Sequence, residues 1–403
     1  MPATIDLKKL ATEAKSLEPW IVDRRRHLHA NPELSFQEEQ TATFLRKEVQ
    51  TLGLTPSAPV MPGKHGFYTE IKSAKNPDMF VLLRGDMDAL PIHEENEVEF
   101  RSKNEGVGHL CGHDAHTSML LGAVNLVQKH QSELPYSVRF VFQHAEEVSP
   151  GGAKDFVEAG LTKDVIGCFG LHVSPRLPSG YFGLRPGEAM AMVGGFEVTM
   201  RGRGGHGAAP HEAVDPMPAT AAAILALQQI VSRRISPIEP AVVSVCWING
   251  GSANNVIPDE IKFGGTMRTF VRERGPELCR MIEEVITNTA KAYGCTAQVH
   301  AALSYPPVIN DEKAIDAARE AISEMFGPQA PVEVPKVMGA EDFAYFAQSK
   351  PSAFVFLGVL PHGEEFFPLH HAKFLPDEQQ LWKGSALLAA MPFVAGSYLT
   401  ATK

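Results

Sequence analysis

The chain has 403 residues, of which 44% are hydrophobic and 21% are charged, and these values exclude a disordered chain, a collagen-like chain and a disulfide scaffold. Its formal charge of −10 disfavours nucleic acid and anionic membranes as partners, because proteins that bind either are usually basic. The length predicts two or three domains, at roughly 100–200 residues per domain.

Five cysteines, an odd number, argue against a secreted disulfide framework and favour a reducing compartment. The first residues show no apolar segment of the kind that a signal peptide carries. The most apolar helical stretch, residues 219–227, is far shorter than the roughly 20 residues that span a bilayer. We therefore expect a cytoplasmic protein that is not embedded in a membrane.

The first half of the chain alternates between helices and buried strands. Helices are predicted over residues 6–30, 38–54, 116–129 and 152–159, and strands over residues 79–83, 137–142 and 165–171. This alternation predicts an α/β fold with a helix-covered, mainly parallel sheet. Ligands bind beyond the carboxyl ends of the strands in such sheets, and each of these strands is followed there by Asp, Glu or His.

The pattern changes after residue 187. Strands are predicted over residues 196–201, 241–248, 260–269 and 295–301, and helices over residues 216–234 and 276–293. This β-α-β-β-α-β order is that of a ferredoxin-like module. Helix–strand alternation then resumes, with helices over 311–326 and 340–348, a strand over 353–359 and a long helix from 377. We expect one α/β domain, formed by residues 1–187 and 303–403, with an α+β domain inserted at residues 188–302.

Metal-binding residue types gather at the ends of the predicted strands. The densest group is residues 109–116 (HLCGHDAH), in which Cys111 and His113 offer two donors to one site. The other groups follow neighbouring strands: Glu146 with Glu147, His172, and His370. Singly, each has an ordinary explanation as a capping loop, a solvated turn, a core histidine or a surface loop. Because four groups coincide at one edge of the sheet, a metal centre explains them better.

The chain closely resembles the amidohydrolase branch of the aminoacylase/carboxypeptidase metallopeptidase family, which includes hippurate hydrolases, N-acyl-amino-acid amidohydrolases and plant auxin-conjugate hydrolases. The resemblance covers nearly the whole chain. It rests on residues 25–38 (RRHLHANPELSFQE), 83–92 (LRGDMDALPI), 109–117 (HLCGHDAHT), 145–147 (AEE), 170–173 (GLHV), 204–211 (GGHGAAPH), 250–259 (GGSANNVIPD), 265–269 (GTMRT), 338–343 (MGAEDF) and 369–378 (LHHAKFLPDE). Each motif is moderately specific, and their number, order and spacing together are very specific.

The resemblance implies a centre of two divalent metal ions that hydrolyses the amide bond of N-acyl amino acids or related conjugates. It implies that Cys111 bridges the two ions and that the remaining ligands are His113, Glu147, His172 and His370. Glu146 matches the general base, which takes a proton from the attacking water and passes it to the leaving nitrogen. Cysteine, histidine and glutamate together accept zinc, manganese, cobalt or nickel.

Four further residues lie in or beside these motifs, at positions that bear on the ligand set or on the substrate pocket. Asp86 and Asp88 stand where other branches carry a His-x-Asp ligand motif, and we place neither among the ligands. Asp88 is a candidate for orienting a ligand histidine. His144 and Val148 depart from the family pattern beside the base, so they bear on the shape of the substrate pocket.

The inserted domain resembles the family's lid, which usually forms dimers. His206 matches a lid histidine that reaches the partner subunit's active site and stabilises the oxyanion. Asn255 and Arg268 match positions associated with the substrate carboxylate, which suits the planar fork of an arginine. We therefore expect a small N-acyl amino acid as substrate, and a homodimer or higher homo-oligomer formed through the lid.

Three other functions fit parts of the pattern. A cysteine hydrolase with Cys111 as nucleophile would leave Glu147, His172 and His370 unexplained. A metal-binding regulatory protein without activity would have no need of the base Glu146. A metal-dependent dipeptidase or carboxypeptidase is the strongest alternative, and the bridging thiolate and the motif of residues 86–88 favour the amidohydrolase branch over it.

Overall fold

A computed structural model describes residues 5–363 and 365–400, which form two compact units. The first unit contains the residues up to 187, then 308–335 and the residues from 342 onward, and the second contains 188–307 and 336–341. The second unit ends at residue 307 rather than at the expected 302. One reason is that the N–H of Val193 donates to the carbonyl of Tyr305 over 3.0 Å. Residues 336–341 join this unit as the N–H of Ala191 contacts the carbonyl of Gly339 at 2.9 Å.

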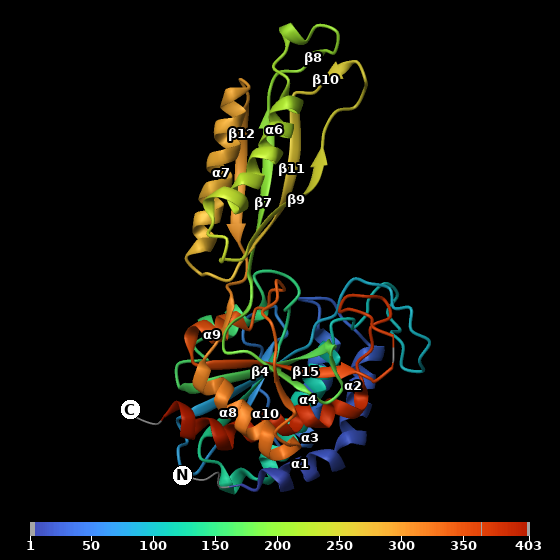
Figure 1. The fold of residues 1–403 in the computed structure, drawn as a ribbon. Coiled ribbons are helices and arrows are strands. Elements are labelled where there is room, and N and C mark those ends of the chain that lie inside the picture. Colours follow the sequence, from blue (N-terminus) through green and yellow to red (C-terminus); the bar gives the residue numbers. More distant parts are fainter. Residues whose placement is uncertain (1–4, 364, 401–403) are drawn as a thin grey trace. The chain divides into compact units, whose positions relative to one another are not determined.

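A seven-stranded sheet with the order β1-β3-β2-β4-β15-β5-β14 forms the centre of the first unit (Figure 1). Its strands are β1 (Phe67–Ile71), β2 (Phe80–Asp86), β3 (Ser137–Gln143), β4 (Val165–Pro178), β5 (Phe182–Leu184), β14 (Pro331–Glu333) and β15 (Ser352–Leu360), and the short β13 (Val308–Asn310) lies outside it. The four central strands run parallel, whereas β1 and β5 run antiparallel to their neighbours β3 and β15. The predicted mainly parallel α/β sheet is therefore confirmed.

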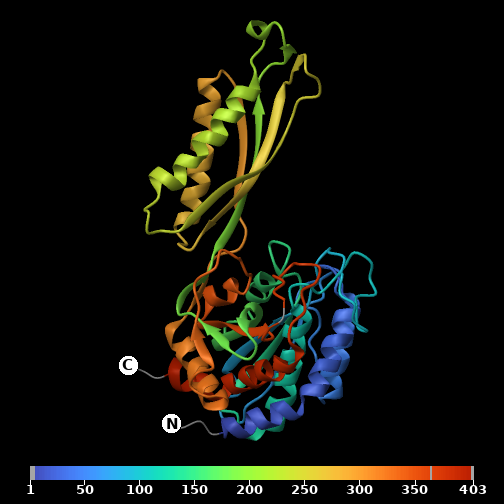
Figure 2. The same cartoon turned by 45° about the vertical axis from the view of Figure 1, so that its right-hand side comes forward.

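Helices cover both faces of this sheet (Figure 2). They are α1 (Leu7–Ser16), α2 (Glu18–Ala30), α3 (Glu39–Thr51), α4 (His113–Lys129), α5 (Gly152–Glu158), α8 (Glu312–Phe326), α9 (Ala344–Ser349) and α10 (Leu381–Leu399). Helices α4 and α10 pack side by side on one face with α1, α2 and α8 around them, and α5 packs against α9 on the other. No helix of the described residues is long and apolar enough to cross a membrane.

The helix expected over residues 6–30 is two helices that meet at Leu17. Pro19 stands in the first turn of α2, where its missing N–H removes no hydrogen bond. The side chains of Leu7, Leu10 and Ala14 from α1 and of Ile21 from α2 are all buried in the core of the first unit. The expected helical range is therefore confirmed, but the break in the backbone at Leu17 was not predicted.

The second unit is a four-stranded antiparallel sheet with the order β12-β7-β11-β9, covered on one face by two helices. Its elements are β6 (Gly187–Met190), β7 (Met192–Arg201), β8 (Gly205–His206), α6 (Pro216–Gln229), β9 (Ala241–Asn249), β10 (Val256–Ile257), β11 (Glu260–Thr269), α7 (Arg274–Ala292) and β12 (Thr296–Leu303). Helix α6 continues into a single π-helical turn, Ile230–Arg234. The order β7-α6-β9-β11-α7-β12 is the predicted ferredoxin-like order.

Candidate metal centre

Metal-binding side chains converge where the central strands of the first unit end. Cys111 and His113 flank the start of α4, and Gly112 between them has a φ of +98°. A Cβ atom at Gly112 would lie 2.3 Å from Cγ2 of Val173, so only glycine fits there. The close contact between the start of α4 and β4 thus brings the two donors to His172, which precedes Val173.

The sequence predicts that His172 follows the end of its strand. In the structure β4 continues to Pro178, so His172 lies within the strand. The pairing of β4 with β2 stops at Gly170, where Arg84 of β2 is its partner, whereas the pairing with β15 continues to Pro178. His172 therefore emerges just beyond the last pair of β2 with β4, although its own strand goes on. For this reason the side chain still reaches the carboxyl edge of β2.

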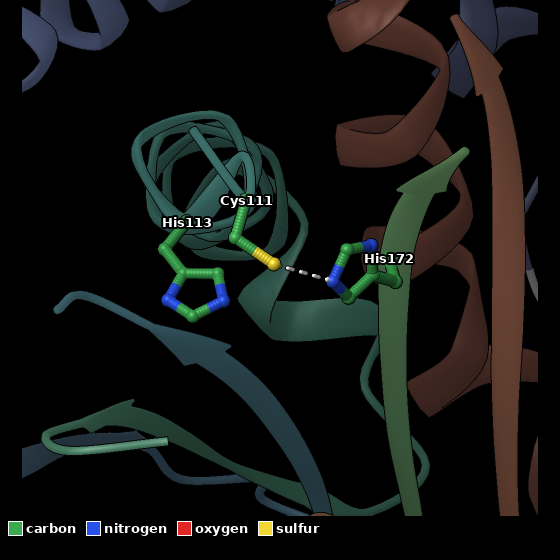
Figure 3. A group of neighbouring side chains, drawn as sticks. All are labelled: Cys111, His113 and His172. Carbon is green, nitrogen blue, oxygen red and sulfur yellow. Dashed lines mark hydrogen bonds between the residues drawn. The ribbon is translucent and has the colours of Figure 1, made fainter. Parts of the chain in front are cut away.

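The donor atoms form overlapping groups in which all atoms lie within 4.8 Å of one another. One group is Cys111, His113 and His172, a second is Cys111, Glu147 and His370, and a third is His113, Glu146 and Glu147. Cys111 is common to the first two groups. Its Sγ lies 3.5 Å from Nε2 of His172, and Figure 3 shows the three side chains of the first group turned toward one another. The structure thus brings together all five predicted ligands and the predicted base.

Two buried atoms of this cluster make no hydrogen bond in the described part of the chain: Nε2 of His113 and Oε1 of Glu147. Oε1 of Glu147 lies 3.2 Å from Nε2 of His370 and 3.8 Å from Nε2 of His113. Buried polar atoms without partners are uncommon in proteins, and an ion among them would supply the missing partner. Thiol, imidazole and carboxylate are the ligand types that transition metals accept, so the residues fit a divalent ion.

The electrostatics of the cluster also favour a cation. Burial lowers the pKa of His113, but the carboxylates of Asp86, Asp88 and Glu147 outweigh burial and raise it to about 10. Burial, followed by the charges of Glu147 and Glu146, raises the pKa of the Cys111 thiol well above its ordinary range. In both residues the nearby carboxylates add negative charge to a buried space, and a divalent ion would compensate that charge.

Asp88 orients His113, Glu146 and Glu147 through hydrogen bonds outside the donor cluster. Nδ1 of His113 lies 2.9 Å from the carbonyl oxygen of Asp88 and 3.2 Å from its Oδ1, so in the neutral imidazole that binds a metal ion Nδ1 carries the proton and the Nε2 lone pair faces the cluster. The same carboxylate accepts the backbone N–H groups of Glu146 and Glu147, each at 3.0 Å, and the hydroxyl of Ser35 at 2.6 Å. One buried side chain therefore fixes a donor histidine and both glutamates.

Asp86 is held away from a ligand role by two other partners. Its Oδ2 accepts from Nη1 of Arg84 at 2.6 Å, and its Oδ1 lies 2.7 Å from Nδ1 of His116. Oδ2 of Asp86 is 3.6 Å from Nε2 of His113, so it contributes charge to the cluster. Burial raises the pKa of Asp86, but Arg84, His113 and His116 together lower it well below its ordinary range.

The backbone is strained at two points beside the cluster. Ala145 has a φ of +50° and His370 a φ of +67°, values that non-glycine residues rarely adopt. Ala145 directly precedes Glu146. The N–H of His370 donates to the carbonyl of Leu110 over 2.8 Å, so the strained turn is tied to the segment that carries Cys111.

Buried charges that sequence reasoning missed support the start of α4. Oδ2 of Asp114 lies 2.8 Å from Nε of Arg25 and 2.8 Å from Nδ1 of His29, and all three side chains are fully buried. Arg25 and His29 belong to the motif of residues 25–38, which was recognised in the sequence without an assigned role. Nε2 of His144, the residue that departs from the family pattern beside the base, lies 3.0 Å from Oδ2 of Asp155 on α5.

The three remaining predicted site residues lie in the second unit. His206 on β8 pairs with Val256 on β10, and the carbonyl of Asn255, which directly precedes β10, accepts the N–H of Gly207 over 2.8 Å, so His206 and Asn255 lie close together. Both residues are exposed. Arg268 lies near the other end of β11, eight residues after Glu260, which is roughly 27 Å along a strand. The unit thus separates Arg268 from the other two.

An α/β sheet with a cluster of Cys, His and Glu at its carboxyl edge, and with Glu146 beside the cluster, defines a metal-dependent hydrolase. Residues 82–392 match the sequence profile described as Peptidase family M20/M25/M40, and the chain belongs to this family. The resemblance noted in the sequence is thereby confirmed.

Known proteins of the same kind cover nearly the whole chain. An Arabidopsis thaliana protein named IAA-amino acid hydrolase ILR1-like 2 is 39% identical over 95% of this chain and 87% of its own. Thermostable carboxypeptidase 2 of Saccharolobus solfataricus is 37% identical, over 95% and 98%. N-acetylcysteine deacetylase of Bacillus subtilis is 36% identical, over 94% and 98%.

A solved structure from Bacillus subtilis, described as a dinuclear metal-binding peptidase of the M20 family, superposes with a TM-score of 0.82 at 33% identity. The match covers 95% of this chain and 99% of that one. Together with the donor cluster, this likeness assigns a divalent metal centre to the protein.

Proposed function

We propose that the protein hydrolyses the amide bond of N-acyl amino acids or related amino-acid conjugates and releases a carboxylic acid and a free amino acid. The observation that carries this proposal is that Cys111 is shared by two groups of donor atoms, one with His113 and His172 and one with Glu147 and His370. A shared thiolate suits two ions of zinc, manganese, cobalt or nickel. Relatives named for hydrolysis of an amino-acid conjugate and for deacetylation support the choice of bond.

The proposed chemistry assigns one task to each side chain. Cys111, His113, Glu147, His172 and His370 would hold the two ions. When bound, such a centre polarises the amide carbonyl and lowers the pKa of water toward neutrality. Glu146, which is 6% exposed, lies in one group with His113 and Glu147 and would take the proton from the attacking water. It would then pass this proton to the leaving nitrogen.

The second unit would act as a lid that completes the site in a homodimer. We assign His206 to the oxyanion and Asn255 and Arg268 to the substrate carboxylate. The support is that β9 is an edge strand with exposed apolar side chains, Trp247 at 39% and Ile248 at 53%. An exposed apolar edge is a site where a second strand can add, so we expect a second copy of the chain to pair there.

We also propose a cytoplasmic location for the enzyme. All five cysteines are free thiols, one of them, Cys246, being exposed. Free thiols persist in a reducing compartment. Cell fractionation followed by detection of the protein would test this location.

The function is tested by a panel of N-acetyl amino acids, N-benzoyl amino acids and dipeptides, assayed before and after dialysis against a chelator. We expect turnover of N-acyl amino acids, loss of turnover on dialysis, and recovery when a divalent ion is added back. Full activity in demonstrably metal-free protein would contradict the metal mechanism. Turnover of dipeptides alone would replace the proposed activity with that of a dipeptidase or carboxypeptidase.

A further inference from the structure

The turn that carries Glu146 and Glu147 is held by two buried carboxylates. The backbone N–H of Ala145 donates to Oε1 of Glu38 over 2.8 Å. The next two N–H groups, of Glu146 and Glu147, donate to the two carboxylate oxygens of Asp88. Three consecutive N–H groups therefore end on two acidic side chains that come from distant parts of the chain.

Glu38 is an unfavourable residue to bury at this place. Its side chain has no exposed surface, and its Oε2 has no hydrogen-bond partner in the described part of the chain. Burial, followed by the negative charge of Asp88, raises the pKa of Glu38 to about 7. A buried carboxyl group that leaves one oxygen without a hydrogen bond, next to a second carboxylate, destabilises the fold. Such a residue calls for an explanation other than packing.

The local backbone supplies that explanation. Ala145 adopts a left-handed conformation that alanine disfavours, and its N–H is the group that Glu38 accepts. Phe36, two residues before Glu38, is also left-handed with a φ of +66°, and Ser35 donates to Asp88. The segment of residues 35–38 thus places the Glu38 carboxylate against the N–H of Ala145 and supports the Asp88 carboxylate through Ser35.

We propose that Glu38 is a positioning residue that holds Ala145 in its left-handed conformation and thereby aims Glu146 and Glu147 at the metal centre. The expected effect of Glu38 on turnover rests on the proposed function. Its expected effect on the structure rests only on the geometry of the turn. Glu38 is the last residue of the motif at 25–38. The proposed chemistry assigns Glu38 no other role.

Three variants separate the acceptor from the charge. Glu38→Ala removes the acceptor. Glu38→Asp keeps the charge, but the side chain is one methylene too short to reach Ala145. Glu38→Gln removes the charge and keeps a carbonyl oxygen that can accept the same N–H. Glu33→Ala is the matched control, because the Glu33 carboxylate also accepts backbone N–H groups, from Gln40 at 3.1 Å and Thr41 at 2.7 Å, at the start of α3.

The first measurement is amide hydrogen exchange of the peptide that covers residues 143–149 in the metal-loaded protein. We expect exchange of this peptide to become about tenfold faster or more in Glu38→Ala and Glu38→Asp, and to change little in Glu38→Gln and Glu33→Ala. Because this readout needs no substrate, it tests the inference even if the wild-type protein turns over no N-acyl amino acid. Absence of turnover in the wild-type protein would overturn the proposed function but not this inference.

The second measurement is steady-state kinetics with metal content determined on the same samples. Glu38→Ala and Glu38→Asp should lower kcat by about tenfold to about a hundredfold with little change in KM, because a small displacement of a catalytic group has effects of this size. Glu38→Gln should restore most of the rate. If Glu38→Ala does not fold, Glu38→Asp decides. Wild-type exchange and wild-type kcat in Glu38→Asp would overturn the inference.

Discussion

The backbone N–H of Val173 donates a hydrogen bond of 2.9 Å to Nε2 of His116. Nε2 is therefore an acceptor without a proton, and the proton of this imidazole lies on Nδ1, where it is donated to Asp86. In His113 the nitrogen with an acceptor is also Nδ1, but its Nε2 makes no hydrogen bond in the described part of the chain and faces the donor cluster. Two histidines of one short motif thus differ in whether Nε2 is available to a metal ion.

This difference predicts opposite effects on metal content. His113→Ala should lose bound metal, because it removes a donor atom. His116→Ala should keep the metal but lower the free energy of unfolding by about 1–3 kcal/mol, since it leaves Asp86 and the N–H of Val173 buried without this partner. Elemental analysis and thermal unfolding of both variants would check the prediction. Loss of metal in His116→Ala with an intact fold would argue against it.

Glu146→Gln should keep the fold and the metal but lower kcat by about 10²–10⁴-fold. The amide has nearly the same shape as the carboxylate but cannot accept the proton of water. Glu147→Gln is the matched variant, and it should lose metal as well as activity, because Glu147 lies in two of the donor groups. Wild-type turnover in a metal-loaded Glu146→Gln protein would remove Glu146 from the role of base.

Cys111→Ala should bind fewer than two divalent ions per subunit. A thiolate shared by two ions contributes to both sites and reduces their mutual repulsion, so its removal affects both. Cys279→Ala on α7 in the second unit is the control and should keep full occupancy. Two tightly bound ions per subunit in Cys111→Ala, counted by elemental analysis after gel filtration, would be incompatible with a bridging thiolate.

The stability of the first unit should depend on Glu94 at acid pH. Its buried carboxylate lies 2.9 Å from Nε2 of His29 and accepts the N–H of Ser102 at 2.8 Å. Burial raises the pKa of Glu94, but these hydrogen bonds, led by that of His29, outweigh burial and lower it to about 2. A pKa that is lower in the folded state gives stability that is complete above the unfolded value and is lost as the pH falls through the folded one.

Glu94→Gln should therefore lower the free energy of unfolding by about 1–3 kcal/mol at pH 7. The difference from wild type should shrink as the pH falls from the ordinary value of 4.5 toward about 2. Urea unfolding at several pH values would measure this, with Glu95→Gln at the exposed neighbouring position as the control. A difference that does not change with pH would show that the charge of Glu94 is not stabilising.

Two inactive variants, Glu146→Gln and His206→Ala, should complement each other when they are refolded together. If His206 acts in the partner's active site, a mixed dimer contains one site with both residues intact. Random mixing of equal amounts gives half mixed dimers with one good site each, so about a quarter of wild-type activity should return, as expected for an interface that contributes to the site. No recovery on mixing would place His206 in its own subunit's site or outside the mechanism.

The sequence by itself determined most of the longer helices and strands, because their apolar periods are local, but it did not predict β1, β5 or β14. The alternation of buried strands with helices predicted the mainly parallel sheet, and the change of pattern after residue 187 predicted the ferredoxin-like second unit. Residue type and position at strand ends predicted which side chains would meet, and Cys111, Glu147 and His370 do lie in one donor group.

Only the tertiary structure decided how those side chains are oriented and held. Residue type alone does not separate His116 from His113, and the structure shows the reason for their different roles: the N–H of Val173, 57 residues further along the chain, occupies Nε2 of His116. Glu38 gave no sign of its contact with Ala145, 107 residues away. The physical reason is that hydrogen-bond partners of buried polar groups are set by which strands lie side by side. The order β3-β2-β4 brings these distant segments together, and no local period in the sequence encodes that order.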